Sequence, residues 1–228
     1  MYAVNLYVYA REGDKKMGGR GTSSSGSIGG RGHQDFGGDW GKMYNQLDAD
    51  LKRAKVTDIS PEDVQEAIVD WSGGGYRAIR AIQRGEEHPD AWSMTAEHAR
   101  ILDRYIDVAP KWNGGNLYRG TSIDQLDKVQ KAFSNGQTIS MGGLSSWTDS
   151  REIATKFIGG TTNSGIVFVT ATKSAKNGVS IDGFARRGEG EVLMSSKARF
   201  KVQNIQKTTQ TVTAKKSRDI YVVTVKEV

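Results

Sequence analysis

Two glutamates, Glu189 and Glu191, stand one residue apart in the segment 188–194, which reads Gly-Glu-Gly-Glu-Val-Leu-Met. Alternate side chains of a strand share a face, so a strand through both positions would place the two carboxylates side by side. Neighbouring acids repel each other, and folding alone gives little reason for such a pair. A site that must stabilise a cationic transition state gives a reason. For this motif alone, a solvated strand is the simpler interpretation.

The segment 117–120, Leu-Tyr-Arg-Gly, predicts a strand that ends on an arginine followed by a glycine. The guanidinium of Arg119 could bind a diphosphate through paired hydrogen bonds. Gly120 would allow a ligand to approach the backbone closely. Taken alone, the segment fits an ordinary surface arginine better.

The segment 144–149, Leu-Ser-Ser-Trp-Thr-Asp, predicts a strand that ends on hydroxyl groups before a helix. Thr148 or Asp149 would cap that helix. Ser145 could instead hold a carboxylate by a hydrogen bond, and Trp147 could line a flat pocket. Capping and hydroxyl positioning are compatible, so the segment leaves both roles open.

Composition excludes several chemistries. The chain of 228 residues has no cysteine, which excludes disulfides, thiol nucleophiles and cysteine-ligated metal sites. Its three histidines, His33, His88 and His98, are not paired at the spacing of metal ligands, and a histidine-based triad has no support.

Positive charge is concentrated at the C-terminus. The net charge is 32 − 26 = +6, and the residues from Ser195 onward carry eight Lys or Arg against Asp219 and Glu227, which is 8 − 2 = +6. A basic C-terminal sheet could face nucleic acid or an acidic partner. A solvated strand face with lysines guarding an edge is at least as good an interpretation.

The start of the chain predicts neither a signal peptide nor a membrane anchor. No apolar run approaches the roughly 18–20 residues of a membrane span. Residues 1–10 lack a basic segment and contain Asn5, unlike a signal peptide. A secreted effector and a phage-encoded protein that acts in the cytoplasm both remain open, as does the oligomeric state.

An α+β fold is expected to position these residues. Residues 1–39, rich in glycine and serine, predict a flexible arm, and residues 40–228 predict one domain, helical over 40–115 and β-rich over 116–228. The expected helices cover 40–54, 60–73, 76–83, 95–109, 122–133 and 149–158. The expected strands cover 116–119, 138–140, 143–146, 166–172, 179–181, 191–194, 200–205 and 220–226.

The order of the three segments, an arginine, then Ser-Ser-Trp, then Glu-x-Glu, each at a strand edge, resembles the mono-ADP-ribosyltransferases of the R-S-E class. That class includes bacterial toxins and their phage relatives. The resemblance covers residues 60–228, and flanking patterns agree with it, among them Ala-Thr-Lys-Phe at 154–157 and Gly-Val-Ser-Ile at 178–181. Each motif is weak by itself, whereas their order and spacing together are fairly specific.

The resemblance implies a split β-sandwich of two small sheets with an N-terminal helical layer. NAD+ would lie in the cleft as a co-substrate, with no metal. Ser145 would position the catalytic glutamate, Glu191 would be that glutamate, and Glu189 matches the acid of enzymes that modify arginine side chains. The residues implied to bind NAD+ are Arg119, Tyr118, Gly120, Ser146, Trp147 and Phe157.

Two departures from the family pattern stand out. The Ser-Thr-Ser motif of the family is Ser-Ser-Trp here, so Trp147 replaces the third hydroxyl. The aromatic residue that often stands three positions before the first glutamate is replaced by Arg186, and the nearest aromatic is Phe184. These departures put the role of the third hydroxyl and the recognition of the acceptor by this loop in question.

The implied mechanism suits these residues. Loss of nicotinamide from NAD+ leaves a ribosyl cation, as in glycoside cleavage. Glu191 would stabilise the developing charge through a ribose hydroxyl, and Arg119 would fix the diphosphate. Glu189 would orient the acceptor and take its proton. The expected function is therefore transfer of ADP-ribose from NAD+ to an acceptor, foremost a protein arginine side chain.

Three alternatives stay open. The chain could be an NAD+ glycohydrolase, with water as the acceptor, or a transferase directed at nucleic acid, as the basic C-terminal strands would permit. A basic phage-structural or nucleic-acid-binding module without enzymatic activity is the third, supported by the glycine-rich arm and the charge of +6.

Overall fold

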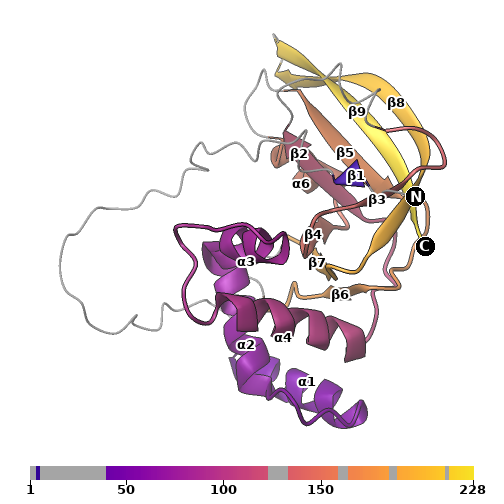
Figure 1. Ribbon diagram of the computed structural model, residues 1–228. Coiled ribbons are helices and arrows are strands. Elements are labelled where there is room, and N and C mark those ends of the chain that lie inside the picture. Colours follow the sequence, from indigo (N-terminus) through magenta and orange to yellow (C-terminus); the bar gives the residue numbers. More distant parts are fainter. Residues whose placement is uncertain (1–3, 6–39, 123–132, 159–163, 185–188, 214–215) are drawn as a thin grey trace.

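A computed structural model of the chain describes residues 4–5, 40–122, 133–158, 164–184, 189–213 and 216–228. The arm predicted over 1–39 lies outside them apart from the short strand β1 (Val4–Asn5), and the helix predicted over 122–133 lies outside them apart from its two end residues. In the described part the helices of the first half lie on one side and the strands on the other (Figure 1).

The helices of the first half lie close to the ranges predicted from the sequence. Its elements are α1 (Trp40–Arg53), α2 (Pro61–Asp70), the π-helix η2 (Trp71–Gly75), α3 (Tyr76–Gln83) and α4 (Thr95–Val108). The start of α2 is a capping box, in which Ser60 Oγ accepts a hydrogen bond from the Asp63 backbone N–H and the Asp63 carboxylate accepts one from the Ser60 N–H. In α1 the buried apolar residues Met43, Leu47 and Leu51 lie four apart, which gives the helix one apolar face.

The three glycines at 73–75 do not end the second helix, contrary to the sequence prediction. The chain continues from α2 through η2 into α3. Gly74 has φ 117°, a conformation open to glycine and strained for other residues. A Cβ atom on Gly75 would lie 2.4 Å from Asp70 Oδ1. The glycines therefore permit a widened, kinked turn between two helices rather than a stop.

The strands form one sheet in the order β1-β3-β8-β9-β5-β2-β4-β7-β6. The strands after β1 are β2 (Tyr118–Ser122), β3 (Thr138–Ser140), β4 (Ser145–Thr148), β5 (Gly165–Thr170), β6 (Gly178–Ser180), β7 (Glu191–Met194), β8 (Arg199–Thr213) and β9 (Lys216–Glu227). A short helix, α6 (Arg151–Lys156), follows β4. The α+β class is confirmed, but the split into two sheets is not, because β2 and β4 are joined, although by the single residue pair Tyr118 and Thr148.

The sheet curves strongly around a core. Trp147 on β4 and Phe200 on β8 are four strands apart in the sheet order, which in a flat sheet would separate them by about 19 Å. Their ring centroids are 5.2 Å apart. Both rings belong to one buried cluster with Phe168, Val192 and Val223, so β4 and β8 face each other across this core.

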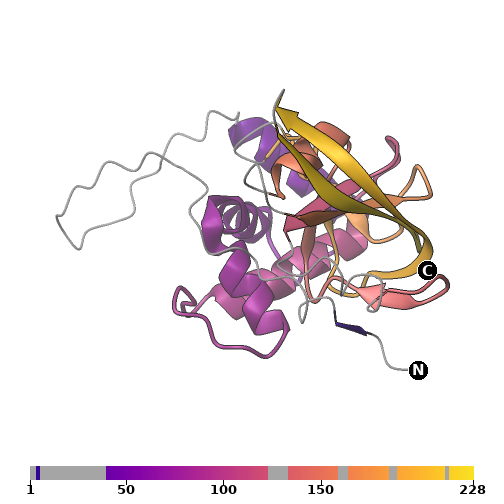
Figure 2. The ribbon, with the colours of Figure 1, turned by 90° about the horizontal axis from the view of Figure 1, so that it is seen from above.

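A second core lies between the helices and the strands β4, β7 and β6. Leu193 of β7 and Val179 of β6 are buried there with Ile68 of α2 and Leu102 of α4. The view from above shows the helices beside the curved sheet (Figure 2). Strand β7 is therefore covered on both faces, by the sheet core next to Val192 and Met194 and by the helices next to Leu193.

The last two strands are much longer than predicted. The sequence predicts strands over 200–205 and 220–226, whereas β8 has 15 residues and β9 has 12. They pair along nearly their whole length, from Phe200 with Glu227 to Thr213 with Lys216. The extra part is rich in threonine and glutamine and lacks the apolar alternation on which the prediction depended.

Candidate active site

Glu191 is the first residue of β7 and carries the polar contacts of the site. Ser146 Oγ on the neighbouring strand β4 donates a hydrogen bond to Glu191 Oε1 at 2.5 Å. The indole Nε1 of Trp71 donates to the same oxygen at 3.1 Å and lies 3.2 Å from Ser146 Oγ. Elements distant in the sequence, η2, β4 and β7, thus meet at one carboxylate.

The pKa of Glu191 is raised above its ordinary value. Burial of the carboxyl group is the largest cause, and the negative charges of Glu189 and Asp182 raise the pKa further. The hydrogen bonds from Ser146 and Trp71 act in the opposite direction because they favour the charged form. The site therefore holds a poorly solvated carboxylate, and two hydrogen-bond donors offset part of the cost of burying its charge.

Ser145 does not contact Glu191, which corrects the expectation for this residue. Side chains alternate along β4, so Ser145 shares a face with Trp147 and accepts a hydrogen bond from its indole Nε1 at 3.1 Å. Both are 1% exposed, and Trp147 lies in the sheet core. Trp147 is therefore a residue of the sheet core, and Ser146 is the serine that is hydrogen-bonded to the glutamate.

The hydroxyl motif is consequently displaced by one residue. Counted from the serine that contacts Glu191, it reads Ser146-Trp147-Thr148, and its third position does carry a hydroxyl. Thr148 Oγ1 donates to the backbone oxygen of Glu189 at 2.7 Å. The third hydroxyl thus fixes the turn that leads into β7.

Glu189 lies outside β7, so the strand periodicity that would pair it with Glu191 does not apply. Gly190 between them has φ 60°, a left-handed conformation that favours glycine. Its N–H donates to Asp182 Oδ1 at 2.7 Å, and a Cβ atom there would lie 2.2 Å from Asp149 Oδ1. The two glutamates are brought near each other by a turn built around glycine, with Asp182 as a partner that sequence analysis missed.

Arg119 reaches the site from β2. Its Nη1 atom donates to the backbone oxygen of Ser146 at 2.7 Å, next to the serine that contacts Glu191. Arg119 and Glu191 are therefore brought together through Ser146, which stands in the place expected for Ser145. Tyr118, beside the arginine, packs against a small apolar cluster of Ile158, Val167 and Ile220.

The structure gives Gly120 a role in packing, and its expected role toward a ligand stays a prediction. A Cβ atom at this position would lie 1.8 Å from the backbone oxygen of Ala154 in α6, so the glycine lets α6 pack on β2. Phe157, the C-cap residue of α6, is 41% exposed. It is not part of the core, and its role toward a ligand stays a prediction.

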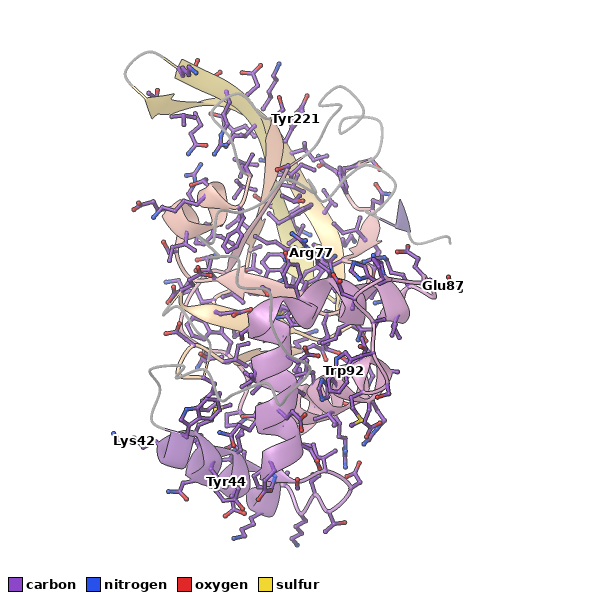
Figure 3. The ribbon with its side chains drawn as sticks, turned by 90° about the vertical axis from the view of Figure 1, so that its left-hand side faces the viewer. Lys42, Tyr44, Arg77, Glu87, Trp92 and Tyr221 are labelled. Atoms are coloured by element: carbon purple, nitrogen blue, oxygen red, sulfur yellow. The ribbon has the colours of Figure 1, made fainter. Side chains whose placement is uncertain are left out.

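Sequence analysis did not predict the contact between Trp71 and Glu191. The helical spacing of Trp71 predicts a core residue, and Trp71 is 3% exposed. Its ring packs edge-on against Tyr76, with centroids 6.1 Å apart, and the Tyr76 hydroxyl accepts a hydrogen bond from Arg77 Nε. Figure 3 shows Arg77 between the helices and the strands. The only sequence signal for a special geometry here is the run of three glycines after Trp71.

Two kinds of feature are absent from the described residues. No group of three or more histidine, aspartate or glutamate side chains in them is arranged to hold a metal ion. No helix in this part of the chain combines the length and the apolar character needed to cross a membrane.

Comparisons with known proteins identify the fold. The Vis toxin of Vibrio splendidus, an ADP-ribosyltransferase whose structure contains agmatine, is 19% identical, with a TM-score of 0.57 over 82% of this chain and 85% of that one. The chain has the fold of ADP-ribosyltransferase toxins. Plx2a, an ADP-ribosyltransferase toxin of Paenibacillus larvae, is similar at 16% identity, with a TM-score of 0.55 over 83% of this chain and 93% of that one. No family model and no curated protein sequence matches.

Proposed function

We propose that this protein transfers ADP-ribose from NAD+ to an arginine side chain of a protein and releases nicotinamide. The observation that carries the proposal is the half-buried carboxylate of Glu191, with Ser146 hydrogen-bonded to it at 2.5 Å and Arg119 hydrogen-bonded to the backbone of that serine. The fold that surrounds these residues is the one found in ADP-ribosyltransferase toxins.

The chemistry needs a stabilised ribosyl cation. When the bond between nicotinamide and ribose breaks, positive charge develops on the ribosyl carbon, and a carboxylate in a poorly solvated site stabilises that charge strongly. Glu191 would act through a ribose hydroxyl, a hydrogen bond that strengthens in the transition state. Arg119 would hold the diphosphate and so place the ribosyl carbon.

Glu189 is proposed to bind the acceptor. It lies on the turn that Thr148 and Gly190 hold in place, outside the strand, and its charge is near enough to raise the pKa of Glu191. A carboxylate there can bind a guanidinium and accept its proton. Agmatine, the ligand in the Vis structure, carries a guanidinium group, which supports arginine as the acceptor.

Label transfer from NAD+ tests the proposal. The wild-type protein, mixed with NAD+ labelled in its adenylate part and a cell lysate, is expected to label protein and to release nicotinamide. Glu191→Gln should lose both reactions, because the amide lacks the stabilising charge. Glu189→Gln should lose transfer and retain some NAD+ hydrolysis, because only the acceptor site is changed.

The same assay separates the alternatives. Free ADP-ribose without labelled macromolecules would indicate a glycohydrolase, and label removed by nuclease would indicate a nucleic-acid acceptor. Equal loss of both reactions in Glu189→Gln would contradict a separate role in binding the acceptor. Salt-dependent DNA binding without NAD+ turnover would reject the enzymatic proposal.

A further inference from the structure

We propose that Trp71 is a positioning residue for Glu191, whose indole N–H fixes one carboxylate oxygen so that the other faces the substrate. The inference rests on the proposed function, because it assigns a role within the same site. Trp71 comes from the helical half of the chain, and the carboxylate comes from the strand half.

The hydrogen bonds to the Glu191 carboxylate go to only one of its two oxygens. Ser146 Oγ at 2.5 Å and Trp71 Nε1 at 3.1 Å both donate to Oε1. Within the described parts of the chain, no hydrogen bond is made to Oε2. Two donors on a single oxygen restrain rotation of the carboxylate, and the oxygen left over can accept a hydrogen bond from a ribose hydroxyl. Such restraint lowers the reorganisation that the transition state requires.

The π-helix η2 places the indole where it can reach the strand. A π-turn widens the helix by one residue per turn and so changes the direction of the side chains around it. The change is possible here because Gly74 adopts φ 117° and because Gly75 leaves room for the Asp70 side chain. Asp70 is held in turn by His98, whose Nδ1 lies 2.9 Å from Asp70 Oδ2. Helix α4, which carries His98, thus supports the turn that presents Trp71.

The indole has an electrostatic consequence as well as a steric one. An indole N–H donates and cannot accept, so it favours the carboxylate over the neutral acid. The hydrogen bond from Trp71 lowers the pKa of Glu191, against the larger effect of burial. Packing alone could explain a buried tryptophan, but it would not explain a change in the charge state of Glu191 when only the N–H is removed.

Replacing the donor while keeping a ring tests the inference. In Trp71→Phe we expect kcat for nicotinamide release to fall about tenfold, with KM for NAD+ little changed. The acid limb of the pH–rate profile should move to higher pH, because the N–H that favours the charged carboxylate is lost. Trp112→Phe is the matched control, because the Trp112 indole donates to Gly115 O and not to the site. It should leave kcat and the pH profile unchanged.

A second replacement keeps the test valid if Trp71→Phe fails to fold. Site-specific incorporation of β-(3-benzothienyl)alanine at position 71 preserves the shape of the double ring and removes only the N–H donor. The same fall in kcat and the same shift of the acid limb are expected.

The outcomes distinguish two failures. A wild-type protein that releases no nicotinamide overturns the proposed function, and the inference falls with it. An active wild-type protein whose folded position-71 variants keep its kcat and its pH profile overturns the inference alone. A loss of activity without any shift of the acid limb likewise assigns Trp71 to packing and contradicts the positioning role.

Discussion

At the scale of single residues, opposing influences set the charge of Glu191. Burial and the nearby negative charges of Glu189 and Asp182 raise its pKa, whereas the hydrogen bonds from Ser146 and Trp71 lower it. The proposed chemistry needs the carboxylate, so activity should rise with pH as Glu191 loses its proton. Every substitution that changes one of these influences should therefore move the acid limb in a predictable direction.

A substitution at Asp182 can separate the effect of its negative charge from the effect of its hydrogen bond with Gly190. Its Oδ1 atom accepts from the Gly190 N–H at 2.7 Å, and the amide oxygen of an asparagine can accept the same bond. In Asp182→Asn, loss of the negative charge should lower the pKa of Glu191 and move the acid limb of nicotinamide release to lower pH. This is the opposite direction to the shift expected for Trp71→Phe.

The control for this measurement is Asp182→Ala, which loses both the charge and the acceptor for Gly190. We expect it to reduce kcat as well, since the turn into β7 is no longer held. A pH profile of Asp182→Asn that coincides with that of the wild type would show that the charge of Asp182 does not act on Glu191.

Residue types indicated the candidate site, but they did not determine which of the two serines, Ser145 or Ser146, faces Glu191. Leu144 and Trp147 are both buried, in different cores on opposite faces of their segment. They are three residues apart, so apolar alternation cannot decide which of the intervening serines faces the glutamate. Ser145 and Ser146 were therefore distinguishable only once the neighbouring layers were placed.

At the scale of elements, the contact between α6 and β2 fixes the strand that carries Arg119. Gly120 leaves room for the backbone of Ala154. Arg218 on β9 donates from Nη2 to Thr155 O in the same helix at 2.8 Å. The helix is thus held on one side by β2 and on the other by β9, and its position controls where the strand bearing Arg119 can lie.

Gly120→Ala should distinguish packing from the approach of a ligand. A methyl group 1.8 Å from the Ala154 oxygen must displace α6, so the free energy of unfolding should fall by about 3 kcal/mol, the upper end of overpacking costs. Urea denaturation measures this change. Gly183→Ala is the control, because nothing lies within 4 Å of a Cβ at Gly183. Unchanged stability with a raised KM for NAD+ would instead support the interpretation made from the sequence.

Elements with strong local signals were predictable, and those shaped by distant contacts were not. The capping box at Ser60 and the apolar spacing of α1 are local, so both helices were located correctly. Strand β7 was also located correctly, at Glu191–Met194. The π-helix breaks the 3.6-residue period on which helix prediction depends. Its glycines led to the prediction that the second helix ends there. For this reason the sequence marked Trp71 as a core residue and missed its indole contact.

At the scale of the whole molecule, part of the positive charge of the C-terminal segment is paired within the protein itself. Lys207 pairs with Asp219 at 3.0 Å, and Lys197 pairs with Asp107 at 2.7 Å. Arg218 is 8% exposed and bonded within the fold. These contacts favour the interpretation of a solvated strand ribbon over a surface shaped for nucleic acid.

Arg218 joins the long β8–β9 ribbon to the rest of the molecule, which gives a final prediction. Its Nε atom donates to Gln210 Oε1 across the ribbon at 3.0 Å, and its Nη2 atom donates to Thr155 O. Arg218→Ala would leave the buried Thr155 oxygen without this donor, so the free energy of unfolding should fall by about 1–3 kcal/mol. Lys216→Ala, on the exposed part of the same strand, should change it by no more than about 0.5 kcal/mol. Equal effects of the two substitutions in urea denaturation would mean that the ribbon is not anchored through Arg218, and the position of α6 would then depend on β2 and Gly120 alone.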